Sequence, residues 1–201
     1  MALVVLTAAR LALRWAARSR ERRAALLATS DAVEAALIAA ALLFLVVDPF
    51  VLQAYNIPSA SMRPTLAPHD HVVVDRLSYR LGRPARQEIA VCLAPPQALG
   101  PGEPAPRRDI VKRIVGLAGD VVEVREGHVL VNGRPLARPA GASAPVRDFE
   151  ALLVPPGMVF VMGDNPAHSL DSRAWGALGA DRLVGRVVAI IWPPGRAGAV
   201  R

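Results

Sequence analysis

The chain has 201 residues, of which 53% are hydrophobic and only 4% aromatic, and its formal net charge is +7. This length allows one domain with an appendage. Cys92 is the single cysteine, which excludes an intramolecular disulfide and any zinc site built from several cysteines. The positive charge is spread along the chain without a helix-turn-helix or zinc-finger motif, so we do not expect nucleic acid as a partner.

The basic side chains are almost all arginine. Lys and Arg together number 24, and Lys112 is the single lysine. Arginine stays protonated in proteins, whereas a buried lysine can lose its proton. Lys112 is therefore a candidate for acid–base chemistry, and the alternative is a lysine retained only for a salt bridge.

An apolar segment near the N-terminus predicts a transmembrane helix over residues 31–52. Residues 35–47 are apolar without a break, and the whole segment has the length of about 20 residues that a bilayer requires. Arginines are concentrated before it, so the positive-inside rule places residues 1–30 in the cytoplasm and residues 53–201 outside. A buried helix is the alternative for the apolar run.

Residues 2–13 form a second apolar stretch, which Arg10 interrupts. We interpret it as an interfacial helix, with a short extra membrane span as the alternative. It does not resemble a cleavable signal peptide, because its positive charge follows the apolar run instead of preceding it.

The rest of the chain reads as an all-β domain of short antiparallel strands. Runs of β-prone residues alternate with Gly, Pro and Asn, and Glu126-Gly127 and Asn132-Gly133 are hairpin turn signals. Helical periodicity is absent apart from Asp148–Leu153, and the Pro-rich residues 94–108 and 134–156 are expected to be surface loops. The expected strands are His71–Leu77, Glu88–Leu93, Asp109–Gly116, Asp120–Arg125, His128–Val131, Met158–Met162 and Leu183–Trp192.

The first candidate for chemistry is the segment IPSASMRPTL at residues 57–66, directly after the predicted membrane helix. Two prolines flank its serines and restrict the backbone. A rigid turn that presents a hydroxyl suits a nucleophile. The alternative is an ordinary polar turn before the first strand.

The second candidate is the segment DIVKRIVGLAGD at residues 109–120. Strand alternation places Lys112 on one face with Ile110 and Ile114, and we expect that face to point inward. Burial would disfavour the ammonium form and lower the pKa of the lysine. The alternative is a lysine that extends to solvent at the rim of the sheet.

The third candidate is the loop GDNPAHSLDSRAWG at residues 163–176. Its short polar side chains can hold other loops by hydrogen bonds, and Asp171 can pair with Arg173. An ordinary Asx-rich turn is the alternative.

Together these three segments resemble the boxes of the type I signal peptidases, membrane-bound serine endopeptidases with a serine/lysine dyad. They occur in the family's order behind an N-terminal anchor, and LVGRVVAIIW at residues 183–192 is similar to the family's closing strand. The resemblance implies a signal-peptidase-like β fold in a bacterial inner-membrane protein. It also implies preprotein signal peptides, the lipid bilayer and the export translocase as partners, and no metal or other cofactor.

The resemblance also implies roles for residues at matching positions. Ser61 would be the nucleophile and Lys112 the general base. Ser59 would contribute to the oxyanion hole and Ser169 would orient the lysine amine. The supporting salt bridge would join Asp171 and Arg173.

The implied substrate is a signal peptide cleaved after a small-x-small site of the A-x-A type. Small side chains would enter two shallow apolar pockets along an extended peptide. Ile57, Leu66 and Val111 flank the dyad in the sequence, so they are candidates to line those pockets.

Other functions fit part of the sequence. A His-dependent serine hydrolase would use His168 with Asp171, or one of the nearby His69 and His71. A self-cleaving repressor would share the dyad but not the membrane segment. The remaining alternatives are a specialised serine/lysine processing protease with few substrates and a non-catalytic accessory of the translocase.

Overall fold

The computed structural model describes residues 15, 33–42, 51–98, 109–142 and 146–200. Backbone contacts divide the chain into two units, Met1–Pro49 and Phe50–Arg201. Residues 33–42 of the first unit are helical and exposed. Within the described residues, no helix has both the length and the apolar character to cross a bilayer. The predicted membrane helix lies partly outside the described residues, and the expected interfacial segment at residues 2–13 lies wholly outside them.

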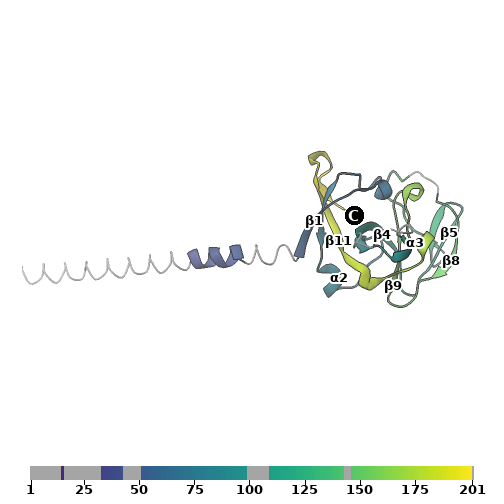
Figure 1. Cartoon of the computed structure of the whole chain (residues 1–201), viewed down its shortest axis with the longest axis horizontal. Helices are drawn as coiled ribbons and strands as arrows, with labels where there is room; N and C mark the ends of the chain where they lie inside the picture. The colour runs from purple at the N-terminus through teal and green to yellow at the C-terminus, as the bar shows by residue number, and fades with distance from the viewer. Residues whose placement is uncertain (1–14, 16–32, 43–50, 99–108, 143–145, 201) are drawn as a thin grey trace, which may run out of the picture. The chain divides into compact units, whose positions relative to one another are not determined.

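The second unit is built from two antiparallel sheets, which confirms the predicted all-β class. The larger sheet has the order β1-β2-β11-β3-β4-β9-β10, with β12 added to β11, and the smaller has the order β7-β6-β5-β8. In Figure 1, β1 and β11 lie at one end of this unit, and β5 and β8 lie at the other. The larger sheet contains β1 (Leu52–Asn56), β2 (His71–Asp75), β3 (Ile89–Leu93), β4 (Asp109–Leu117), β9 (Met158–Met162), β10 (Leu178–Gly179), β11 (Leu183–Trp192) and β12 (Gly198–Ala199).

The smaller sheet and several single helical turns complete the unit. The strands of that sheet are β5 (Val121–Arg125), β6 (His128–Val131), β7 (Arg134–Pro135) and β8 (Phe149–Leu153). The helical turns are η1 (Ala60–Met62), α2 (Ser78–Leu81), η2 (Pro96–Ala98), η3 (Pro166–His168), α3 (Ser172–Trp175), η4 (Ala180–Arg182) and η5 (Pro194–Arg196).

One predicted element is wrong. Residues 148–153 were expected to be helical, but Phe149–Leu153 form β8, so residues 134–156 are not simply a loop. The register explains the error, because Val122 pairs with Leu152 while Val124 pairs with Phe149. This bulge places one extra residue in β8, so Phe149 and Leu152 contact the same core cluster at a spacing that resembles a helix.

Strand β4 lies in the middle of the larger sheet, between β3 and β9. Both of its faces are covered. Val111 contacts the core cluster that also contains Ile57 and Leu66, whereas Ile110 and Ile114 belong to a cluster with Cys92. Val111 thus lies on one face and Ile110 and Ile114 on the other, as alternation predicts, but burial extends to both faces of this strand.

Candidate active site

Ser61 lies in η1, the single turn that follows β1. The flanking loop is closed at its base by hydrogen bonds from Ile57 N to Asp70 O (2.9 Å) and from His69 N to Ile57 O (2.8 Å). Ser61 is only 5% exposed, and its Oγ lies 3.1 Å from Ser59 Oγ. The sequence segment between the two prolines therefore forms a fixed turn that brings both serine hydroxyls together.

Lys112 is held in the interior by the pairing of β4 with β3, where it lies opposite Ala90. It is 5% exposed. Burial lowers the pKa of Lys112 below its usual 10.5, and the negative charge of Asp171 opposes part of that shift. The neighbouring Cys92 adds no charge at neutral pH, because burial raises the pKa of its thiol to about 12.

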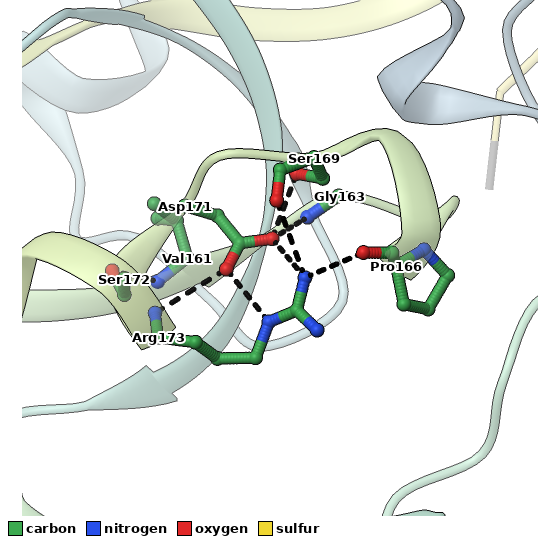
Figure 2. Close-up of polar contacts among 7 residues, drawn as sticks. All are labelled: Val161, Gly163, Pro166, Ser169, Asp171, Ser172 and Arg173. Carbon is green, nitrogen blue, oxygen red and sulfur yellow. Dashed lines mark hydrogen bonds and ion pairs between the residues drawn. The ribbon is translucent and has the colours of Figure 1, made fainter. Parts of the chain in front are cut away.

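The loop after β9 contains Asp171, whose buried carboxylate accepts hydrogen bonds from several groups of the same loop. Figure 2 shows the Arg173 guanidinium facing the Asp171 carboxylate, with Nε 2.8 Å from Oδ1 and Nη2 2.8 Å from Oδ2. Gly163 N donates to Oδ2 at 3.0 Å and Ser169 Oγ donates to the same oxygen at 2.7 Å. Burial alone would raise the pKa of Asp171, but these hydrogen bonds hold it below its usual value. The expected pairing of Asp171 with Arg173 is thus present.

The turn that carries Ser61 and this loop are joined through Gly163 and Asn165. Asn165 N donates to Ser61 O at 2.9 Å, and its Nδ2 donates to Ala60 O at 3.2 Å. A Cβ added to Gly163 would lie 2.6 Å from Ser61 O and would clash with Ser169 Oγ. Only a glycine allows the residue after β9 to pass between Ser61 and Ser169.

The three segments converge, since η1 lies against β4 and Lys112 interacts electrostatically with Asp171. In the described part of the chain, however, no hydrogen bond joins Lys112 Nζ to Ser61 Oγ, whose partner is Ser59. Nucleophilic catalysis by a serine needs a nearby base, and a buried amine of lowered pKa on the strand that contacts the Ser61 turn can serve as one.

The candidate pocket residues lie at different depths. Ile57 and Leu66 are 1% and 0% exposed and belong to the same core cluster as Met62 of the Ser61 turn. Val111 is half-buried and contacts that core from β4. Val111 is therefore the candidate with surface available to a substrate.

A buried ion pair beside the site was not anticipated from the sequence. Arg113 follows Lys112 in β4, and its guanidinium binds Asp164, which precedes Asn165. Thr65 Oγ1 donates to Asp164 Oδ2 at 2.5 Å, so the pair also fixes the segment that follows Ser61. The available signal was an arginine among valines and isoleucines in a strand that was expected to be interior.

The histidines of the rival hydrolase hypothesis do not contact the site serine. His168 is exposed and its Nδ1 lies 3.4 Å from Asn165 Oδ1. Among the described residues, no hydrogen bond connects His168, His69 or His71 with Ser61. The described part of the chain also contains no cluster of three His, Cys, Asp or Glu residues arranged to hold a metal ion.

Comparison with known proteins gives a consistent family. The family model described as signal peptidase, peptidase S26, matches residues 30–192. The chain is 38% identical to signal peptidase I of Leptolyngbya laminosa, over 74% of this chain and 73% of that protein. It is 33% identical to signal peptidase I of Mycobacterium tuberculosis, over 92% of this chain and 80% of that protein. A solved signal peptidase I from Enterococcus faecalis aligns with 52% of this chain and 96% of its own, at a TM-score of 0.41 and 27% identity.

The chain therefore belongs to the signal peptidase family, peptidase S26. It is a serine endopeptidase of the signal peptidase I class, and its activity is the removal of signal peptides from preproteins. Membership in a peptidase family argues against the hypothesis of a non-catalytic accessory.

Proposed function

We propose that Ser61 is the nucleophile of signal peptide cleavage and that Lys112 is its general base. The burial of Lys112 beside the Ser61 turn carries this proposal, because burial favours the neutral amine that can accept a proton. A serine hydroxyl needs such a base to attack an amide. Catalytic hydrogen bonds are often long in the free enzyme and shorten when substrate binds, so the Ser61 hydroxyl would turn from Ser59 towards Lys112 in the complex.

Ser169 would orient the lysine amine. Its hydroxyl proton is used in the 2.7 Å hydrogen bond to Asp171 Oδ2, so its oxygen lone pairs are left as acceptors. An N–H of Lys112 directed at those lone pairs would aim the amine lone pair elsewhere, towards Ser61. The Arg173 ion pair fixes Asp171 and through it the direction of the Ser169 hydroxyl.

The reaction would proceed in two stages. Ser61 Oγ attacks the scissile carbonyl carbon while Lys112 takes the hydroxyl proton, and the protonated amine then gives that proton to the leaving nitrogen. The resulting ester is hydrolysed by a water whose proton passes to Lys112, and Ser61 is regenerated with its proton. The Ser61 N–H and the Ser59 hydroxyl would bind the oxyanion, and each such donor contributes about 3–4 kcal/mol in enzymes of this kind.

The substrate would be an extended signal peptide with a small-x-small sequence before the cleaved bond. Val111 would contact the small side chains, with Ile57 and Leu66 forming the apolar floor beneath them. Because Ile57 and Leu66 are buried in the core, a site above them would be shallow and would not admit a large side chain. A specialised protease of the same mechanism would share this preference but would reject most small-x-small precursors, so the range of precursors that are cleaved distinguishes the two.

We further propose a bacterial inner-membrane enzyme with a single membrane helix at residues 31–52, a cytoplasmic N-terminus and its catalytic domain on the extracytoplasmic side. The apolar run and the arginines before it support this orientation. The active site would then meet preproteins as they leave the export translocase, close to the lipid surface.

The test is cleavage of a preprotein with an A-x-A site by the full chain in detergent. Ser61→Ala and Lys112→Arg are each expected to lower kcat by at least about 100-fold, because arginine retains the charge of lysine but cannot accept the proton. His168→Ala is the matched control and is expected to remain close to wild type. Near-normal turnover by Lys112→Arg would exclude the dyad, and loss of activity in His168→Ala would favour the histidine-dependent hydrolase.

A further inference from the structure

The C-terminal turn η5 contacts the loop that carries Ser61. Arg196, its last residue, binds Asp70 through two nitrogens, with Nε 3.0 Å from Oδ1 and Nη2 3.0 Å from Oδ2. The Asp70 side chain is 2% exposed, whereas that of Arg196 is 38% exposed. The buried Asp70 carboxylate, near the start of the second unit, is therefore paired with an arginine near the end of that unit.

Asp70 closes the loop between β1 and β2. Its Oδ2 accepts a hydrogen bond from Ala67 N at 2.8 Å, and its carbonyl accepts one from Ile57 N at 2.9 Å. The side chain and backbone of one residue therefore bind both arms of the loop in which Ser61 is located. The arginine supplies the positive charge that a carboxylate at this depth needs.

Arg196 also reaches past Asp70 to the segment after the nucleophile. Its Nη2 donates to Thr65 O at 3.1 Å. On its other side, Thr65 Oγ1 donates to Asp164 Oδ2 at 2.5 Å. Leu66 N donates to Met62 O at 2.9 Å, which ties this segment to the helical turn of Ser61.

We propose that Arg196 is a positioning residue for catalysis: it holds the Ser61 turn against β4 through Asp70 and the Thr65 carbonyl. The inference rests on the proposed role of Ser61 as the nucleophile. Ser61 O is already fixed by Asn165 on one side, and Arg196 fixes the following segment on the other. Without Arg196 the turn keeps its covalent place in the loop but loses the contact that sets its distance from Lys112.

The chain offers a matched control for the simple loss of an ion pair. Arg86 binds Asp120 in the same way, with Nε 2.8 Å from Oδ2 and Nη2 2.5 Å from Oδ1. The side-chain exposures are also alike, 43% for Arg86 and 7% for Asp120. This second pair joins the residue before β5 to the segment before β3, and among the described residues neither partner forms a hydrogen bond with the Ser61 loop.

The experiment compares Arg196→Ala with Arg86→Ala in the full chain in detergent, at a temperature well below both melting temperatures. We expect similar losses of melting temperature in the two variants. Arg196→Ala should lower kcat by about tenfold to 100-fold, because small displacements of a reacting group have effects of that size. KM and the shape of the pH profile should stay within about twofold of wild type, and so should kcat of Arg86→Ala.

Two further variants separate positioning from stability. Arg196→Lys retains the charge for Asp70 but not the second contact to Thr65 O, so it should recover melting temperature more fully than kcat. Arg196→Ala combined with Asp70→Asn removes the buried charge, so it should also recover melting temperature while kcat stays low.

Different results would contradict the positioning role of Arg196 and the role of Ser61 as nucleophile. If Arg196→Ala turns over at the wild-type rate, or if Arg86→Ala loses as much kcat, the positioning role is wrong. A Ser61→Ala variant measured in parallel tests the assignment itself. If Ser61→Ala is active, the assignment of Ser61 as the nucleophile is wrong. If Ser61→Ala is inactive but Arg196→Ala is fully active, only the positioning role of Arg196 is wrong.

Discussion

Arg113 and Asp164 form a doubly hydrogen-bonded ion pair, with both N–O distances at 2.8 Å and side-chain exposures of 6% and 3%. Arg113 is the chain neighbour of Lys112, and Asp164 is the chain neighbour of Asn165, which binds Ser61 O. The pair therefore links the strand of the proposed base to the loop that holds the proposed nucleophile.

Removing one partner of this pair should destabilise the protein strongly. Arg113→Met leaves the Asp164 carboxylate buried without a counterion, which costs about 3–5 kcal/mol of unfolding free energy. Equilibrium denaturation in urea measures the change. Arg125→Met is the control, because its pair with Glu123 has an arginine side chain that is 67% exposed and should contribute at most about 1 kcal/mol. Equal losses in the two variants would contradict the structural importance of the Arg113 pair.

The pH dependence of cleavage should report the protonation of Lys112. In the proposed mechanism the neutral amine is the active form, so kcat/KM should rise with pH through a pKa that lies below 10.5 because burial disfavours the ammonium. The charged groups that act on this amine at neutral pH are Asp171, Arg173 and Asp164, all of which follow β9 in the chain. Cys92 of β3 also lies near the amine, but its thiol is uncharged at neutral pH.

Two substitutions should move this acid limb in opposite directions. Asp171→Asn removes the negative charge that supports the ammonium, so the limb should shift to lower pH. Arg173→Gln removes a positive charge that opposes the ammonium, so it should shift to higher pH. Both variants should also have a lower plateau, because Ser169 loses its fixed orientation. Profiles of kcat/KM against pH give the shifts, and limbs that coincide with wild type would mean that another group controls the rate.

A methyl group at Gly163 should push Ser61 and Ser169 apart. In Gly163→Ala the new Cβ would clash with Ser169 Oγ and lie 2.6 Å from Ser61 O, so both residues must move. We expect a fall in kcat of about 100-fold, the usual consequence of a displacement near 1 Å at a reacting group. Gly198→Ala is the control, because an added Cβ at that position meets no atom within 4 Å. Wild-type kcat in Gly163→Ala would show that the close approach does not matter for turnover.

Acidification should lower the stability of the folded protein, partly because Asp120 becomes protonated. Hydrogen bonds from Arg86, Leu117 and Asn132 lower the pKa of Asp120 from 3.8 to about 2, with the Arg86 contact as the largest cause. Because the folded state holds the carboxylate ionised, this contribution to stability is complete above pH 3.8. It is lost as the pH falls towards about 2.

The Asp120→Asn variant tests this linkage. It should be less stable than wild type at neutral pH, and the difference between the two should shrink as the pH falls through this window. Thermal melts at a series of pH values measure the difference. A gap that stays constant down to pH about 2 would mean that Asp120 does not contribute through its charge.

The segments of the candidate site and most strands of the sheet could be located from the amino-acid sequence alone. The spacing of apolar residues located the strands around Lys112, and the serine between two prolines located the turn of Ser61. These features are local, since they depend on residues that are close together in the chain. The predicted face of Lys112, shared with Ile110 and Ile114, follows from the same local periodicity.

The depth at which these residues are buried, and the partners they bind from distant parts of the chain, depend on the three-dimensional arrangement of the strands. Alternation separates the two faces of β4 but does not reveal that both are covered. The bulge in β8 gives its apolar residues a spacing that resembles that of a helix, so the strand was not predicted. The bonds from Arg113 to Asp164 and from Arg196 to Asp70 depend on the order of strands in the sheet. A single lysine among arginines was visible in the sequence, but its lowered pKa comes from the sheet and loop that exclude water around it.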